Sequence, residues 1–110
     1  MNITSNKAGE INIIQIQGRL DTTNYSQLEH HLSSLTDKNE VHILLDLEKL
    51  EYISSSGLRI LLMFLKKIKA ANGRFMLCGM SEDIREIFEI SGFINIFETF
   101  VDQNAALGSS

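Results

Sequence analysis

The sequence predicts one α/β domain, in which a mixed β-sheet with a parallel centre carries helices packed against it as a second layer. Three observations support this prediction. Short apolar runs typical of strands alternate along the chain with stretches whose apolar residues recur at helical spacing. The run at residues 41–47 carries apolar side chains on both sides, as a central parallel strand does. The 110 residues suit one domain with its own core, and no linker interrupts residues 1–110.

Two strands are predicted before the first helix. Residues 3–4 are expected to pair as a short first strand, and residues 10–17 form the second. Within the second strand the alternation slips by one residue between Ile13 and Ile14, which either a bulge or burial on both faces explains. Gly18 is expected to end this strand. The following helix has Asp21 as its expected N-cap and an apolar stripe at helical spacing: Tyr25, Leu28, Leu32 and Leu35.

The middle of the chain predicts a strand that leads into a long helix. One side of the strand carries Val41, Ile43, Leu45 and Leu47, whereas Leu44 lies on the other side. The helix has a core stripe of Leu58, Leu61, Leu62, Leu65 and Ile68. Asn72-Gly73 is expected to end it. A second apolar patch on this helix is expected either to join the core or to be exposed as a docking surface: Ile60, Met63 and Phe64.

The C-terminal third predicts a buried strand at residues 74–79 and then a helix capped by Ser81. Its inward side chains are Ile84, Ile87 and Phe88. Gly92 is expected to end the helix, and Phe93 is placed to pack back on it. A last apolar segment covers residues 94–101, and residues 102–110 are expected to fray.

Composition and charge exclude several classes of protein. The formal charge of −4 gives no indication of nucleic-acid binding. The longest uninterrupted apolar run, residues 60–65, is too short to cross a bilayer, and the N-terminus lacks the apolar region of a signal peptide, so we expect no membrane insertion and a cytoplasmic protein. The single cysteine, Cys78, excludes an internal disulfide and is expected to be buried in a strand.

The sequence gives little support for an enzyme, a metal site or a cofactor. It contains no GxSxG, GxxxxGK[ST] or GxGxxG motif, although a weak nucleotide site is not ruled out by this. The histidines His30, His31 and His42 have no cysteine or carboxylate cluster beside them in sequence and are expected at the surface. An aspartyl-phosphate receiver would place Asp46 at a central strand, but the acidic pair and later lysine of receivers are missing.

The strongest functional signal is the run of three serines and a glycine at residues 54–57, where strand gives way to helix. The first turn of a helix has unpaired N–H groups and partial positive charge, so hydroxyls there can cap the helix or carry an anion. One capping serine needs no companions. Reversible phosphorylation is the alternative, because about −1.5 to −2 charges at pH 7 suit a helix start while disrupting a complementary surface.

The segment DLEKLEYISSSGLRILL, with GRLDTTNYSQLE before it and NGRFMLCGMSEDIREIFEISGFINIF after it, resembles the STAS domain of bacterial anti-sigma factor antagonists. The most specific parts are the SSG-L junction, the G-x-L-D before the first helix and the late I-F-x-x-S-G-F segment. The resemblance implies a STAS-like fold and a partner-switching protein. In such proteins the unphosphorylated antagonist binds an anti-sigma factor that is also a serine kinase with a GHKL-type ATPase fold. Phosphorylation dissolves the complex, and a PP2C-type phosphatase resets it.

Position within this resemblance implies that Ser55, two residues before the glycine, is the phosphoacceptor, with Ser56 as second choice. Asp21 matches an acidic residue at the kinase-facing edge. The implied partner-binding set is Asp21, Ser54, Ser55, Ser56, Gly57, Leu58 and Arg59.

One departure from the family pattern concerns Ser54, which stands where many members have aspartate, so the charge beside the acceptor is one unit less negative. The alternative function within this fold is that of a STAS subunit in a lipid-transport ABC complex, without a phosphorylation cycle.

Overall fold

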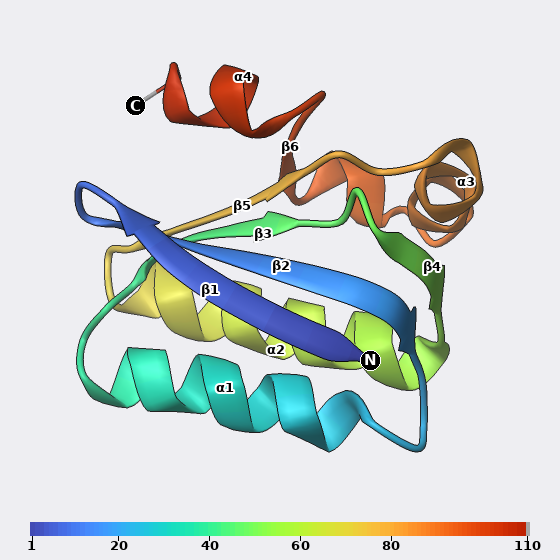
Figure 1. The fold of residues 1–110 in the computed structure, drawn as a ribbon, viewed down its shortest axis with the longest axis horizontal. Coiled ribbons are helices and arrows are strands. Elements are labelled where there is room, and N and C mark those ends of the chain that lie inside the picture. The colour runs from blue at the N-terminus through green and yellow to red at the C-terminus, as the bar shows by residue number, and fades with distance from the viewer. Residues whose placement is uncertain (110) are drawn as a thin grey trace.

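The computed structural model describes residues 1–109, in which six strands form a sheet of order β1-β2-β3-β5-β6, with β4 paired to β2 off this path (Figure 1). Strand β1 is antiparallel to β2, and the remaining pairings are parallel. The predicted mixed sheet with a parallel centre is therefore confirmed. The strands are β1 (Asn2–Ala8), β2 (Ile11–Leu20), β3 (His42–Asp46), β4 (Leu50–Ile53), β5 (Arg74–Cys78) and β6 (Glu98–Phe100).

Helices cover both faces of the sheet, but unequally. Figure 1 shows α1 (Tyr25–Asp37) and α2 (Ser55–Ala70) side by side below the sheet and α4 (Gln103–Leu107) above it. Helix α3 (Glu82–Ile90) and the short 3₁₀ helix η1 (Phe93–Asn95) follow β5 and share the core of α1 and α2. The predicted second layer consists of α1, α2 and α3 on one face of the sheet. Helix α4 adds a small cover on the opposite face.

Burial on both faces accounts for the slip between Ile13 and Ile14 in β2. Ile14 packs in the larger core with α1 and α2, whereas Ile13 lies in a second cluster on the α4 side. The irregular register lies further on, between Gly18 and Arg19, where β2 pairs with β4. Gly18 does not end the strand as predicted, because the next two residues, Arg19 and Leu20, pair with β4.

Two other boundaries differ from those predicted. The first strand extends from Asn2 to Ala8, well beyond residues 3–4, since its pairing with β2 does not depend on apolar alternation in its own polar sequence. The tail does not fray over residues 103–107. Asp102 caps α4 by accepting a hydrogen bond from the N–H of Ala105 at 2.8 Å, and Ala106 is fully buried. The predicted fraying of Ser110 lies outside the described residues.

Helix α2 buries a wider face than its predicted stripe. Ile60 and Phe64 of the second apolar patch belong to the core, whereas Met63 remains 41% exposed. Leu58 and Leu62 of the predicted stripe are only half-buried. Asn72 takes the left-handed conformation (φ 60°) after α2, and Gly73 follows because a Cβ there would lie 2.2 Å from the carbonyl oxygen of Val41.

Helix α3 follows the prediction closely. Ser81 accepts a hydrogen bond from the N–H of Ile84 at 3.3 Å, which makes it the N-cap. Gly92 follows the helix in the left-handed conformation, and the ring of Phe93 packs edge-on against Phe88 with centroids 6.3 Å apart. Across residues 1–109 we find no helix with the length and apolar character that crossing a membrane requires.

Candidate functional site

The serine run lies where two parallel strands end and α2 begins (Figure 1). Leu20 ends β2 and Ile53 ends β4 next to it, and these two residues are paired in register. The backbone N–H of Ser54 donates to the carbonyl of Leu20 at 2.9 Å. The turn after β2 and the first turn of α2 therefore meet at one edge, the carboxyl ends of parallel strands, where α/β folds commonly carry their sites.

Ser54 is the N-cap of α2. Its backbone is extended, and its hydroxyl accepts a hydrogen bond from the N–H of Gly57 at 3.2 Å. Its carbonyl accepts a hydrogen bond from the N–H of Leu58 at 2.9 Å, which opens the helix ladder. Helix capping thus accounts for Ser54 and leaves its two neighbours unexplained.

The hydroxyls of Ser55 and Ser56 have different surroundings. Ser56 is half-buried, and its Oγ lies 3.4 Å from Oγ1 of Thr22 on the turn after β2. Ser55 is exposed, and no group within residues 1–109 hydrogen-bonds its hydroxyl. Of the three serines, Ser55 is therefore the one whose side chain is both accessible and unengaged.

Gly57 allows α2 to begin in contact with both strands. A Cβ at this position would lie 2.9 Å from Cγ of Leu20 and 2.9 Å from Cγ1 of Ile53. Gly57 is buried, so it shapes the site from beneath, whereas Leu58 is half-buried and Arg59 is exposed. The exposed part of the helix start is consequently Ser55 and Arg59.

Asp21 is not the N-cap of α1 as predicted. The helix begins at Tyr25 after Asn24, and Asp21 instead closes the turn before it. Its Oδ1 accepts hydrogen bonds from the backbone N–H of Thr23 at 3.0 Å and from the Thr23 hydroxyl at 2.6 Å. Both bonds are local and stabilise the turn at residues 21–24 that precedes the helix.

The same hydrogen bonds set the charge of Asp21. The Thr23 side chain and then the Thr23 backbone N–H hold the pKa of the Asp21 carboxyl below its ordinary value, and nearby Arg19 acts in the same direction. Nε of Arg19 lies 3.6 Å from Oδ2 of Asp21. An ionised carboxylate is therefore held in place one residue from Thr22, which contacts the serine run.

The sequence alone did not identify Arg19 and Tyr52 as neighbours of this site. Pairing of β2 with β4 sets Arg19 opposite Tyr52, and the guanidinium carbon lies 4.3 Å from the centroid of the Tyr52 ring. Tyr52 remains 38% exposed. Predicting this pair would have required recognising β4 as a separate strand. Its four residues, two of them exposed, form too weak a sequence pattern for that.

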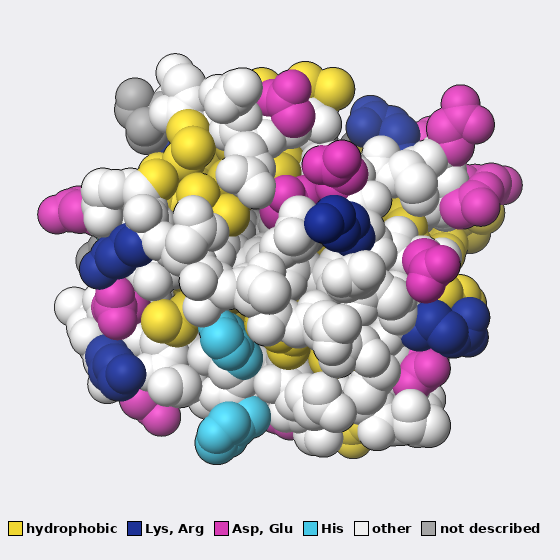
Figure 2. All heavy atoms as spheres, viewed as in Figure 1, with side chains coloured by type: hydrophobic (Ala, Val, Ile, Leu, Met, Phe, Trp, Pro, Cys, Tyr) yellow, Lys and Arg dark blue, Asp and Glu magenta, His cyan; other side chains and the backbone are white. Residues whose placement is uncertain are grey.

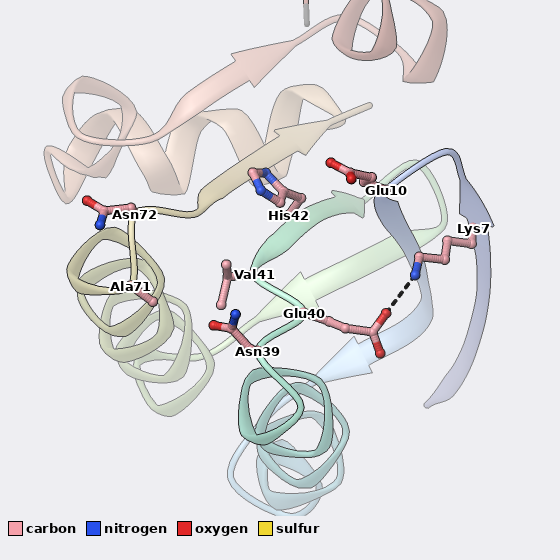
Figure 3. Close-up of a pocket in the computed structure, with 8 residues that line it drawn as sticks. All are labelled: Lys7, Glu10, Asn39, Glu40, Val41, His42, Ala71 and Asn72. Atoms are coloured by element: carbon pink, nitrogen blue, oxygen red, sulfur yellow. Dashed lines mark hydrogen bonds and ion pairs between the residues drawn. The ribbon is translucent and has the colours of Figure 1, made fainter.

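A polar hollow lies at the other end of the sheet, at the amino end of β3 (Figure 3). It encloses about 380 Å³ and includes an ion pair between Nζ of Lys7 and Oε1 of Glu40 at 2.8 Å. His42 also lines it, whereas the serine run lies at the opposite ends of the strands. No three His, Cys, Asp or Glu side chains gather as a metal site within residues 1–109.

Comparison with protein families decides where this fold belongs. The family model described as STAS domain matches residues 2–106. The chain belongs to the STAS domain family. Among curated relatives of this STAS domain is BtrV of Bordetella bronchiseptica, which is named as an anti-sigma factor antagonist. The two are 40% identical over 106 residues, a span that covers 96% of this chain and 91% of BtrV.

Solved STAS structures show the same fold at lower sequence identity. A Thermotoga maritima protein described as an anti-sigma factor antagonist superposes with a TM-score of 0.94 at 18% identity, covering 97% of this chain and 92% of that one. The Bacillus cell fate determinant SpoIIAA in its phosphorylated form gives a TM-score of 0.77 at 22% identity, covering 99% and 100%. The STAS-like fold predicted from the sequence is therefore confirmed.

Proposed function

We propose that this STAS domain is an anti-sigma factor antagonist that works by partner switching. Its unphosphorylated form binds an anti-sigma factor, and phosphorylation of Ser55 releases that partner. The name of the relative BtrV supports the first part. The observation that carries the second part is the position of Ser55, an exposed hydroxyl without a hydrogen bond among residues 1–109, in the first turn of a helix that tolerates added negative charge.

The surroundings of the three serines favour Ser55 over its neighbours. A phosphate on Ser54 would disturb the cap bond to the N–H of Gly57. Ser56 is half-buried against Thr22, so a kinase would have to open that contact to reach it. Ser55 needs neither rearrangement.

The partners follow from the family resemblance. We propose a GHKL-type serine kinase as the anti-sigma factor and a PP2C-type phosphatase that restores the hydroxyl. The binding surface would combine the exposed start of α2 with the turn carrying Asp21, which the contact between Thr22 and Ser56 brings together. Arg19 lies beside Asp21 and contacts the ring of Tyr52, so these two residues extend the surface onto β4.

The switch has an energetic requirement. Lowering the affinity 100- to 1000-fold takes about 3 to 4 kcal/mol. A phosphate can cost this much if the partner must desolvate it or sets a carboxylate against it, but not if it stays solvated on the rim. Ser55 is accordingly proposed to lie inside the contact patch.

The proposal is tested by mapping phosphorylation sites after incubation with ATP and the host's soluble extract. The Ser55→Ala variant is compared with Ser56→Ala, a matched loss of one hydroxyl at the next position. We expect one phosphoryl group on the wild type and on Ser56→Ala, located at Ser55, and none on Ser55→Ala. Normal phosphorylation of Ser55→Ala would refute the assignment.

A binding measurement separates the switch from the alternative function. Copurification should yield an anti-sigma factor with the unphosphorylated protein and lose it with Ser55→Asp. A protein that is never phosphorylated, in an extract that modifies a control substrate, and that copurifies with a membrane permease would instead be a STAS subunit of a transport complex.

A further inference from the structure

The face of the sheet opposite α1 and α2 carries its own apolar cluster, which the serine site does not use. Four side chains from the three central strands form it, each with no more than 3% of its surface exposed: Ile13, Leu44, Met76 and Cys78. Helix α4 covers them and contributes Ala106 as its one buried residue. A helix of five residues thus covers the apolar cluster on this face of the sheet.

A buried carboxylate holds α4 in place. Asp46 at the end of β3 is 2% exposed, and its Oδ2 accepts hydrogen bonds from Nε2 of Gln103 at 2.7 Å and from Nε2 of Gln15 at 3.3 Å. Its Oδ1 accepts a third bond from the N–H of Glu48 at 3.0 Å. Only the Gln103 bond joins α4 to this carboxylate, so Asp46 keeps two donors when α4 is absent.

The C-terminal segment has further contacts, among them Leu107, which is half-buried and packs against the cluster. Arg74 donates to the hydroxyl of Ser109 at 3.0 Å, but its guanidinium is already held by Glu98 through bonds of 2.8 and 2.7 Å. The link between β6 and α4 passes through Val101, which is 80% exposed. Five residues are too few to keep a helix formed on their own, so α4 exists only while it is docked.

A surface hollow borders the cluster at Met76. A hollow of about 450 Å³ lies between the hairpin of β1 and β2 and the cluster, lined by Ala8, Ile11 and Met76 among others. Figure 2 shows hydrophobic side chains gathered at this place beside α4. The cluster therefore has a surface hollow on its hairpin side, lined in part by Met76.

We propose that α4 is a displaceable cap, which undocks as a unit while the sheet and the other helices stay folded, and so exposes the Ile13, Leu44, Met76 and Cys78 surface. The bond from Gln103 to Asp46 is its latch. Undocking breaks the hydrogen bond from Gln103 and separates Ala106 and the half-buried Leu107 from the sheet, a small group of contacts beside the main core. Local openings of this kind occur well below the free energy of global unfolding.

Cys78 reports the opening, because it is the single cysteine and is fully buried beneath α4. Burial and the neighbouring Asp46 raise the pKa of this thiol to about 12, so it reacts slowly while α4 is docked. The experiment measures the rate at which a neutral aromatic disulfide labels Cys78 in the full-length protein, at denaturant concentrations below the unfolding transition. Gln103→Ala is compared with Gln27→Ala, which removes an exposed glutamine from α1.

We expect Gln103→Ala to speed labelling about 10- to 100-fold, the factor associated with one hydrogen bond to a charged group, and Gln27→Ala to leave it unchanged. The labelling rate should depend weakly on urea, because local opening exposes little surface. Hydrogen exchange should show lost protection in Gln103→Ala at residues 103–107 alone. A labelling rate with the full urea dependence of global unfolding, or one that Gln103→Ala leaves unchanged, would overturn the proposal.

Discussion

The hydroxyl of Thr22 lies 3.4 Å from the hydroxyl of Ser56, and this contact joins the turn after β2 to the first turn of α2. Thr22 is also the residue between Asp21 and Thr23, whose hydrogen bonds fix the acidic turn. One surface therefore contains an ionised carboxylate, an engaged serine and, next to it, the unengaged Ser55. The predictions below test the parts from which this surface is built.

The first prediction concerns the cap. Ser54→Ala removes the acceptor for the N–H of Gly57 and should lower the free energy of unfolding by about 1 kcal/mol. Ser54→Asp should restore that loss, because a carboxylate caps as well and interacts favourably with the helix N-terminus. Urea unfolding measures both changes. Ser55→Ala is the control, expected to change stability by less than about 0.5 kcal/mol. Equal losses for Ser54→Ala and Ser55→Ala would mean that the cap bond contributes nothing.

The second prediction concerns Gly57. A methyl group there meets Leu20 and Ile53 at 2.9 Å, so Gly57→Ala should destabilise the fold by about 1 to 3 kcal/mol despite the higher helix propensity of alanine. The measurement is again the urea midpoint. Gly57→Ala combined with Ile53→Ala, which removes the contacting Cγ1, should cost less than the sum of the two single substitutions. A more stable Gly57→Ala single variant would show that the helix start can move away from the strands.

The third prediction concerns Asp21 and acid. Its pKa in the folded protein lies below the ordinary value of 3.8, mainly because of the Thr23 hydroxyl. The unfolded chain therefore binds this proton more readily, so the stabilisation is present above about pH 4 and is lost as the pH falls through the folded pKa. Carbon-detected NMR titration of Asp21 should show the lowered pKa, and Thr23→Val should raise it. Thr22→Val removes the hydroxyl that faces Ser56 and should leave the pKa of Asp21 unchanged.

The fourth prediction concerns Arg19 and Tyr52. Their stacked contact is exposed, so a double-mutant cycle with Arg19→Ala and Tyr52→Ala should give a coupling free energy of about 0.5 to 1 kcal/mol. Tyr52→Phe keeps the ring and should retain the coupling. A coupling near zero in the cycle, with both single variants folded, would indicate that the two side chains merely lie next to each other.

The elements with strong local signals could be predicted from the sequence. Ser81 and Gly92 bound α3 as their chemistry requires, and Leu44 opposite Ile43 marks β3 as a strand buried on both faces. The serine run at the start of α2 was found for the same reason, since hydroxyls before an apolar helical stripe are a local pattern.

The remaining features depend on pairing between distant segments, which single-sequence patterns do not report. Strand β4 has four residues and is defined by its register with β2, and the contact of Arg19 with Tyr52 follows from that register. Asp21 is a local exception, because its carboxylate can accept from Thr23 either as an N-cap or in a turn, so the local pattern does not determine where α1 begins. Helix α4 forms only against a sheet face assembled from β2, β3 and β5.

The parallel pairing of β3 has a consequence for the newly synthesised chain. Its neighbours β2 and β5 come from opposite sides in sequence, and a helix separates β3 from each of them. The centre of the sheet therefore cannot be completed until β5, which ends at Cys78, has left the ribosome. Until then β3 lacks its second partner strand. Contacts of such sequence separation form slowly, so the nascent domain passes through a stage in which the apolar strand β3 is open to chaperones and to neighbouring chains.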